Sequence, residues 1–217
     1  MTAFTTFAKI KAVKMSDIIE KLVATFIRFP GIGPRQARRF VYHLLGQNSA
    51  ALDNLAQDLL VLKQAVSQCR SCYRFFIVNH HTAAKEVCDL CLDESRDPNI
   101  LMVVEKDSDL EMARKSGHYS GQFFVLGGLL PILAEQPEQK IRINPLLEKI
   151  KTAKNQWREI IIALAVNPEG DNTNEYLQKM LAPSKIKITI LGRGLSTGTE
   201  LEYSDAETLR NALKNRA

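Results

Sequence analysis

The sequence has few cysteines and few aromatic residues, and it lacks a long hydrophobic run. Its 217 residues include four cysteines and one tryptophan. No apolar stretch approaches the roughly 20 residues that a bilayer-spanning helix needs, so we expect no membrane association. The sequence also lacks a P-loop, a dinucleotide-binding fingerprint and a nucleophile elbow. It therefore gives no support for an enzyme that depends on one of these motifs. Nothing resembles a secretory signal, so we expect a cytoplasmic protein with reduced cysteines.

The four cysteines form two close pairs, Cys69-x2-Cys72 and Cys88-x2-Cys91, separated by 15 residues. Each pair can place two thiolates on one tight turn, and the short spacer lets both turns face a single ion. The spacing therefore predicts a zinc site with one ion per chain. Because four thiolates fill a tetrahedral shell and leave no position for water, we expect this zinc to be structural. The alternative is a disulfide framework, which suits an oxidising compartment.

The net charge of +5 suggests an acidic partner such as nucleic acid. This charge is unevenly distributed, because residues 1–50 contain eight Lys or Arg and only two acids. The basic character therefore belongs to the N-terminal part of the chain. Residues 1–14 contain three lysines and no acid, and we interpret them as an extension, or as residues that precede a true start at Met15.

Apolar residues recur at helical spacing after Met15 and predict a first amphipathic helix. Prolines and glycines in the segment 29–34 must end this helix, and Pro34 suits the first position of a second helix that continues to about Leu45. A third helix is predicted at about 50–66. The N-terminal part is therefore expected to be all α.

Beyond the cysteines, apolar runs alternate with amphipathic stretches, which is typical of β-α units around a mostly parallel sheet. The fold class we predict is α/β, with this sheet preceded by the all-α module and a small four-cysteine zinc finger. The predicted strands are 100–104, 123–126, 160–166 and 186–191, and the predicted helices are 109–115, 145–150, 174–181 and 205–215, the last capped by Asp205.

The glycine-rich turn between the first two helices is a candidate phosphate site. Gly31 and Gly33 let a ligand approach the backbone, and the first amides of the next helix point outward at the positive end of its dipole. Such a helix-hairpin-helix holds the DNA backbone without reading base sequence. The alternative is a plain connector with solvated arginines. The arginines that we expect to contact phosphates are Arg28, Arg35, Arg38 and Arg39.

Three acids follow two of the predicted strands. Glu105 follows the strand 100–104, and Glu169 and Asp171 follow the strand 160–166. Residues past the carboxyl ends of parallel strands gather in one crevice, where such acids can hold Mg²⁺ for phosphodiester chemistry. The pattern resembles the Toprim domain of topoisomerases, primases and related nucleases. The alternative is three solvated acids at strand ends.

The order of these parts resembles the RecR family of bacterial recombination mediators, from about Met15 to the C-terminus. The family usually has two more residues between its Asn-Pro and its Glu-Gly-Glu than this chain has before Glu169. Residues 1–14 also lie outside the family pattern. The residues that carry the resemblance are Phe29-Pro30-Gly31-Ile32-Gly33-Pro34-Arg35, the four cysteines, Val103-Val104-Glu105, Gly117-His118-Tyr119-Ser120-Gly121, Val125-Leu126-Gly127-Gly128, Asn167-Pro168, Gly192-Arg193-Gly194-Leu195 and Leu201-Glu202-Tyr203-Ser204-Asp205.

The resemblance implies a domain order and an assembly. Its members form homo-oligomers, commonly tetramers, so we expect a tetramer or a dimer that clamps DNA through the hairpin modules. The domains expected here are an extension at 1–14, a helix-hairpin-helix module at 15–67, a four-cysteine zinc finger at 68–96, a Toprim domain at 97–192, and a C-terminal segment at 193–217 that takes part in oligomer contacts.

The resemblance also implies a non-enzymatic, nucleoid-associated mediator of DNA repair. It implies action with RecO and RecF at junctions and gaps between single- and double-stranded DNA, where single-strand-binding protein gives way to RecA. Glu105, Glu169 and Asp171 then belong to a partner interface, where bound Mg²⁺ is not expected to support catalysis. Two other functions stay open: a Mg²⁺-dependent Toprim nuclease or primase-like enzyme, and a zinc-stabilised adaptor that binds only protein.

Overall fold

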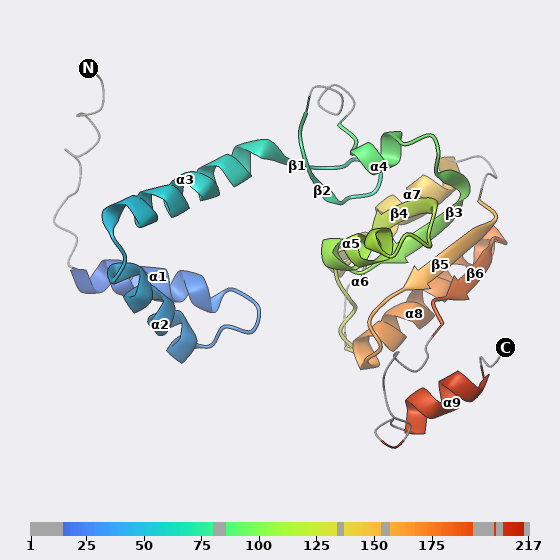
Figure 1. Cartoon of the computed structure of the whole chain (residues 1–217). Coiled ribbons are helices and arrows are strands. Elements are labelled where there is room, and N and C mark those ends of the chain that lie inside the picture. Colours follow the sequence, from blue (N-terminus) through green and yellow to red (C-terminus); the bar gives the residue numbers. More distant parts are fainter. Residues whose placement is uncertain are drawn as a thin grey trace. The chain divides into compact units, whose positions relative to one another are not determined.

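The structure is a computed structural model that describes residues 15–79, 86–133, 137–152, 157–192, 202 and 206–214. The chain divides into two compact units, Met1–Gln64 and Ala65–Ala217, which Figure 1 colours from blue to red along the sequence. The predictions for residues 1–14, for Asp205 and for most of the segment 193–217 lie outside the described residues. No helix in the described part of the chain is both long and apolar enough to span a membrane.

The described part of the first unit is all α, as predicted. The second helix ends at the predicted Leu45, and the third lies within one residue of its predicted bounds. Helices α1 and α2 pack through a small core in which Val23, Ala37 and Val41 are buried. The elements are α1 (Met15–Ile27), α2 (Pro34–Leu45) and α3 (Ser49–Ala65).

The second unit contains the predicted parallel sheet. Its four strands lie in the order β4-β3-β5-β6, and each neighbouring pair is parallel. Val104 at the end of β3 pairs with Val125 of β4 and with Ala163 of β5, so the carboxyl ends of these three strands are level. The strands are β3 (Asp97–Val104), β4 (Gly121–Val125), β5 (Glu159–Ala163) and β6 (Lys187–Ile190).

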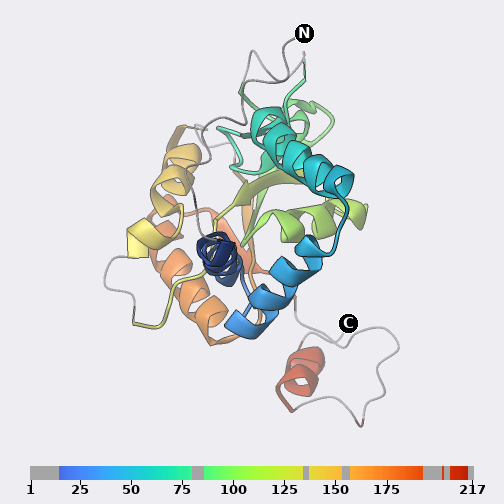
Figure 2. The same ribbon diagram turned by 90° about the vertical axis from the view of Figure 1, so that its left-hand side faces the viewer.

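Each face of the sheet is covered by different elements. Helices α7 (Ile143–Thr152) and α8 (Pro168–Leu181) pack on one face, and α5 (Asp107–Lys115) packs on the other (Figure 2). The cysteine module shares the core of the α5 face. This module consists of the antiparallel pair β1 (Val66–Gln68) and β2 (Phe75–Ile77) and the short α4 (Asp89–Leu92). The remaining elements are α6 (Pro137–Lys140), the 3-10 helix η2 (Ala182–Ser184) and α9 (Ala206–Lys214).

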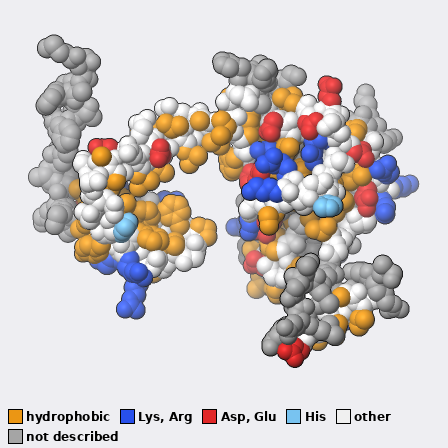
Figure 3. Space-filling model, in the orientation of Figure 1, with side chains coloured by type: hydrophobic (Ala, Val, Ile, Leu, Met, Phe, Trp, Pro, Cys, Tyr) orange, Lys and Arg blue, Asp and Glu red, His pale blue; other side chains and the backbone are white. Residues whose placement is uncertain are grey.

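Helix α3 differs from the other helices of the first unit, because none of its residues is buried. Hydrophobic side chains lie at its surface (Figure 3). Leu52, Leu55, Leu59 and Leu62 recur at intervals of three, four and three residues and are 36%, 43%, 60% and 58% exposed. This spacing places them in one stripe along the helix, which is the pattern of a helix that pairs with another helix.

The junction between β5 and α8 differs from the prediction. The strand ends at Ala163 and not at Val166, and the helix begins at Pro168 and not at Asn174. The side-chain oxygen of Asn167 accepts a hydrogen bond from the Gly170 N–H at 2.7 Å, and Pro168 occupies the first turn. An Asn N-cap followed by Pro is a common start of a helix. These two residues begin α8 at Pro168, although the apolar pattern that follows is too weak to predict a helix there.

Gly170 is fixed by close packing. A Cβ atom at this position would lie 1.9 Å from the carbonyl oxygen of Ala165. Because this contact is with backbone, a rotamer change cannot relieve it. The first turn of α8 therefore lies directly against the loop that follows β5, and only glycine allows this approach.

We expect Gly170→Ala to lower the free energy of unfolding by at least about 2 kcal/mol, because the loop and the helix must move apart. Urea unfolding followed by far-UV circular dichroism measures this difference. Gly192→Ala is the matched control, since a Cβ there meets nothing within 4 Å, and it should change stability by less than about 0.5 kcal/mol. Equal stabilities of the two variants would contradict the packing argument.

Candidate metal centre and nucleic-acid interface

The four cysteines come together as the sequence predicts. Cys69 and Cys72 lie on the turn between β1 and β2, while Cys88 caps α4 and Cys91 lies within it. Their four Sγ atoms lie within 4.8 Å of one another, and all four residues are free cysteines. Among the described residues, they form the one group of three or more His, Cys, Asp or Glu side chains that could hold a metal ion.

The sulfur positions fit a tetrahedral ion. The Sγ atoms of Cys69 and Cys91 are 3.8 Å apart, and those of Cys72 and Cys88 are 3.6 Å apart. Ligand sulfurs around an ion with metal–sulfur bonds of about 2.3 Å lie about 3.8 Å apart. The backbone N–H groups of Cys72 and Cys88 donate to the Cys69 sulfur at 3.5 and 3.3 Å. These donors stabilise a thiolate and orient it, as is common around metal ligands.

The crowding of the thiols also favours a cation. The side chain of Cys72 holds the pKa of the Cys69 thiol well below its usual range, and the side chain of Cys69 raises the pKa of the Cys72 thiol well above its usual range. The ionised form of one sulfur thus opposes ionisation of its neighbour. A divalent cation at the centre lets all the thiols ionise together.

The metal centre is joined to the sheet. The carbonyl oxygen of Cys72 accepts a hydrogen bond from the Val125 N–H of β4 at 2.8 Å. Cys69, Cys72 and Cys88 also belong to the buried cluster that contains Phe123 and other side chains of the sheet. The cysteine module and the α5 face of the sheet therefore share one hydrophobic core.

Two glycines shape the turn between α1 and α2, which the sequence predicts as a phosphate site. Gly31 has φ = 76°, a left-handed conformation that favours glycine. Gly33 caps α2 with φ = −83° and ψ = 168°, and a Cβ there would meet nothing within 4 Å. Neither the backbone conformation nor close packing requires glycine at position 33. Its effect is that no side chain covers the first amides of α2.

The start of α2 offers unpartnered donors. Gly33 has no side chain with which to cap the helix, and the Ala37 N–H is the first to bond back, to the Gly33 carbonyl at 2.9 Å. Helix geometry leaves the earlier amides of Arg35 and Gln36 without a partner inside the helix. An anion can accept from them at the positive end of the helix dipole.

The predicted arginines are exposed, but they are not equivalent. Arg35, Arg38 and Arg39 line one open hollow of about 740 Å³ on α2, whereas Arg28 lies at the turn after α1. Arg38 forms an ion pair with Glu20 of α1, with 2.9 Å between Nη1 and Oε1. Arg39 Nη1 donates to Gln36 Oε1 at 3.3 Å.

Sequence reasoning missed two residues of this hollow. Tyr42 and His43 line it together with the three arginines. They follow Arg38 and Arg39 by four residues each, which places them on the same side of the helix. The i, i+4 spacing from the arginines was the signal that could have identified them.

The three acids lie at two places that follow strands β3 and β5. Glu105 directly follows β3, its side chain is 17% exposed, and its Oε1 lies 3.7 Å from Lys106 Nζ. Glu169 and Asp171 lie in the first turn of α8, where their charge complements the helix dipole. Among the described residues, none of these carboxylates belongs to a group of three or more His, Cys, Asp or Glu side chains that could hold a metal ion.

The described geometry combines a helix-hairpin-helix, a cluster of four cysteines that could hold a metal ion and a Toprim-like parallel sheet, which defines a protein class associated with DNA. Comparison with known families supports this class. Residues 19–62 match the RecR helix-hairpin-helix family, residues 99–192 match the Toprim domain, and residues 194–217 match the RecR C-terminal family.

Curated relatives resemble the chain over most of its length. The chain is 38% identical over 202 residues to the recombination protein RecR of Flavobacterium johnsoniae, which covers 93% of both proteins. It is 38% identical to the RecR protein of Treponema pallidum, covering 93% of this chain and 96% of the relative. It is 36% identical to that of Synechocystis, covering 91% and 81%. The chain therefore belongs to the RecR family.

We expect Cys72→Ser to lose the bound metal and to destabilise the sheet as well. The backbone bond from the Val125 N–H to the Cys72 carbonyl can still form, but the turn that carries this carbonyl is no longer held by the metal. Elemental analysis of purified protein should give one metal ion per chain for the wild type and much less for the variant. Urea unfolding should show a loss of about 2 kcal/mol or more. Ser95→Ala, an exposed change just after α4, should keep both the metal and the stability. A Cys72→Ser protein with a full equivalent of metal would contradict this assignment.

Proposed function

We propose that this protein is a non-enzymatic mediator of recombinational DNA repair that binds DNA as a homo-oligomer, either a tetramer or a dimer. In this proposal it acts with RecO and RecF at junctions and gaps between single- and double-stranded DNA. It thereby helps RecA to replace single-strand-binding protein. Membership of the RecR family supports the recombination role, and the open start of α2 beside exposed arginines is the observation that carries the DNA-binding role.

We propose that Gly31 and Gly33 bring the α2 amides to a DNA phosphate, while Arg28, Arg35, Arg38 and Arg39 supply the charge. Contacts of this kind are made to the backbone and carry no sequence information. Arg35 and Arg39 are expected to contribute most. Arg38 contributes less, because its guanidinium already pairs with Glu20.

The metal in this proposal is Zn²⁺, because four thiolate ligands at tetrahedral spacing suit zinc. When bound, it supplies structure and no catalytic chemistry, since four sulfurs leave no open position. Cys69, Cys72, Cys88 and Cys91 hold it and thereby fix the turn between β1 and β2 against the sheet.

We assign Glu105, Glu169 and Asp171 to a surface that contacts protein partners, with any bound Mg²⁺ playing no catalytic part. Membership of the RecR family supports this assignment, since the curated relatives are named as recombination proteins. The domain limits proposed above, 15–67, 68–96, 97–192 and 193–217, and a cytoplasmic, nucleoid-associated location complete the proposal.

The leucine stripe of α3 is our candidate contact between copies. Leu52, Leu55, Leu59 and Leu62 have the three- and four-residue spacing of a helix that pairs side by side with another helix. Within the described part of the first unit, no residue of α3 is buried, so the stripe is available for a contact. An oligomer also brings several α2 turns to one DNA molecule, which raises their effective concentration.

Arg35→Ala should weaken binding to gapped duplex DNA several-fold and lower the slope of log affinity against log salt by about 1 per lost phosphate contact. Gel shifts across a salt series, with Mg²⁺ present, measure both affinity and cleavage. Lys63→Ala on α3 removes one charge from the same unit and should have little effect. Glu105→Gln should bind like the wild type.

Cleavage of the DNA that disappears in Glu105→Gln would overturn the non-enzymatic proposal and favour a Toprim nuclease. Retained protein partners without any DNA shift at low salt would favour a protein-only adaptor.

Leu59→Glu with Leu62→Glu should reduce the oligomer to a smaller species, because burying two carboxylates in a leucine contact costs several kcal/mol. Light scattering coupled to size exclusion gives the mass directly. Gln57→Glu adds charge to the same helix away from the stripe and should leave the mass unchanged. An unchanged mass in the double variant would place the contact elsewhere.

A further inference from the structure

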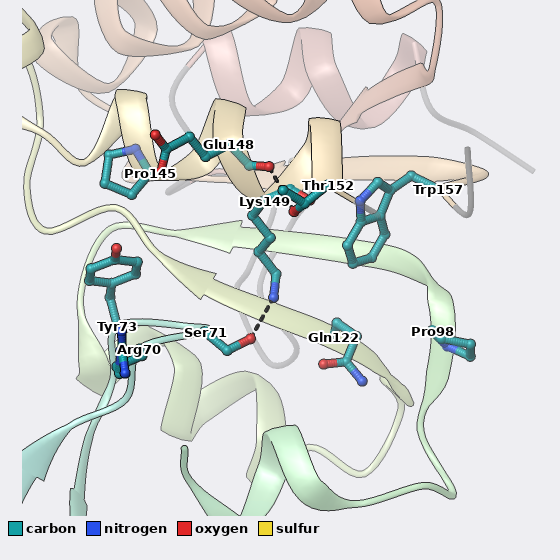
Figure 4. Close-up of a pocket in the computed structure, with 10 residues that line it drawn as sticks. All are labelled: Arg70, Ser71, Tyr73, Pro98, Gln122, Pro145, Glu148, Lys149, Thr152 and Trp157. Carbon is teal, nitrogen blue, oxygen red and sulfur yellow. Dashed lines mark hydrogen bonds between the residues drawn. The ribbon is translucent and has the colours of Figure 1, made fainter. Parts of the chain in front are cut away.

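Two neighbouring cavities of the second unit share one residue, Trp157. One cavity, of about 470 Å³, is lined by Arg70 and Ser71 of the cysteine module, by Lys149 of α7 and by Trp157 (Figure 4). The other, of about 410 Å³, is lined by Trp157 and four basic residues, which are Lys151, Arg158, Lys185 and Lys187. The indole of Trp157 therefore lines both cavities, and each cavity is also lined by Lys and Arg side chains.

Trp157 is the only tryptophan of the chain, and contacts with neighbouring residues hold its ring in place. It lies two residues before the start of β5, and its ring packs in part against the core on the α7 side of the sheet. The Lys149 ammonium lies 5.9 Å from the ring centre and donates to Ser71 Oγ at 2.8 Å. The indole is half-buried, so it is both anchored and partly accessible.

The charge around Trp157 is positive. Arg70, Arg158 and Lys187 each have an acidic partner, Glu86, Asp97 and Glu159 respectively, and Glu148 also lines the first cavity. Against these four acids stand six cations. Within the described part of the chain, Lys149, Lys151 and Lys185 have no carboxylate within 4.0 Å.

This surface lies at the amino ends of the parallel strands, whereas Glu105 lies at the carboxyl end of β3. The two cavities are lined by residues within two positions of the starts of β3, β4, β5 and β6, which are Pro98, Gln122, Trp157 and Lys187. Glu105 follows the end of β3. The cations and the acid therefore occupy different ends of the same sheet.

We propose that the two cavities around Trp157 form a second DNA contact, which binds single strands by stacking a base on the indole and holding phosphates with the surrounding lysines and arginines. An aromatic platform inside a basic groove is the usual design of sequence-tolerant single-strand binding. Only an unpaired base exposes the face that stacking requires. Two adjacent basic hollows also suit an extended polyanion better than a single small anion.

The lone tryptophan makes the contact directly measurable. Titration of the full-length protein with a short oligothymidylate should quench Trp157 fluorescence, with less quenching at higher salt. A duplex of the same length should quench much less, and so should an abasic oligonucleotide, which has phosphates but no bases. Polyglutamate serves as the probe for an acidic peptide.

Lys151→Glu combined with Lys185→Glu should weaken the quenching titration at least 10-fold, and both side chains are exposed, so folding is not at risk. Lys140→Glu on α6 changes an exposed cation that lines neither cavity, and it should behave like the wild type. Trp157→Phe should weaken binding of the oligothymidylate in a gel shift by several-fold.

The proposal is overturned if saturating oligothymidylate leaves the fluorescence unchanged, or if duplex or abasic DNA quenches as strongly. It is also overturned if polyglutamate quenches best, which would assign the surface to an acidic peptide. The inference stands apart from the α2 site: Arg35→Ala should leave the quenching unchanged, and quenching that persists while gapped duplex DNA fails to bind would contradict only the proposed α2 contact.

Discussion

The convergence of four thiols on one point is the interaction on which the second unit depends. Their Sγ atoms lie within 4.8 Å of one another, a distance at which ionised sulfurs repel unless a cation lies between them. The same residues connect the cysteine module to the sheet. Cys72 accepts from the Val125 N–H, and Phe76 and Leu90 are buried together with Met102. A metal held there closes one face of the sheet's core as well as the module itself, so its binding energy acts on the whole unit.

The same constraint positions the surface around Trp157. Arg70 and Ser71 lie between the two cysteines of the first pair, so the turn that presents Cys69 and Cys72 to the metal also fixes these two side chains. Ser71 accepts from Lys149 of α7, which joins that turn to an element more than 70 residues further along the chain. A metal bound to these cysteines would therefore stabilise one wall of the cavity without lining it.

Much of this arrangement could be predicted where the sequence signal is local. The cysteine spacing identified the metal centre, and Pro34 marked the start of α2. The bounds of the strand and helix next to Glu169 and Asp171 were predicted less well, because the apolar run before Asn167 continues past the true end of β5 at Ala163. The side-chain cap of Asn167 begins α8 there and carries Glu169 and Asp171 into a helix. The ion pair of Arg38 with Glu20 was also beyond sequence reasoning, since it joins residues on two different helices.

Net charge was a poor guide to the second unit, for a physical reason. Residues after position 50 sum to a small negative charge, yet the fold gathers six cations from Arg70 to Lys187 around Trp157. The field that a ligand meets depends on local geometry, because charges more than about 10 Å apart are largely screened at physiological salt. A gapped DNA offers duplex and unpaired bases together. In our two proposals the start of α2 contacts phosphates and Trp157 contacts an exposed base, so each contact could be strengthened or weakened without the other.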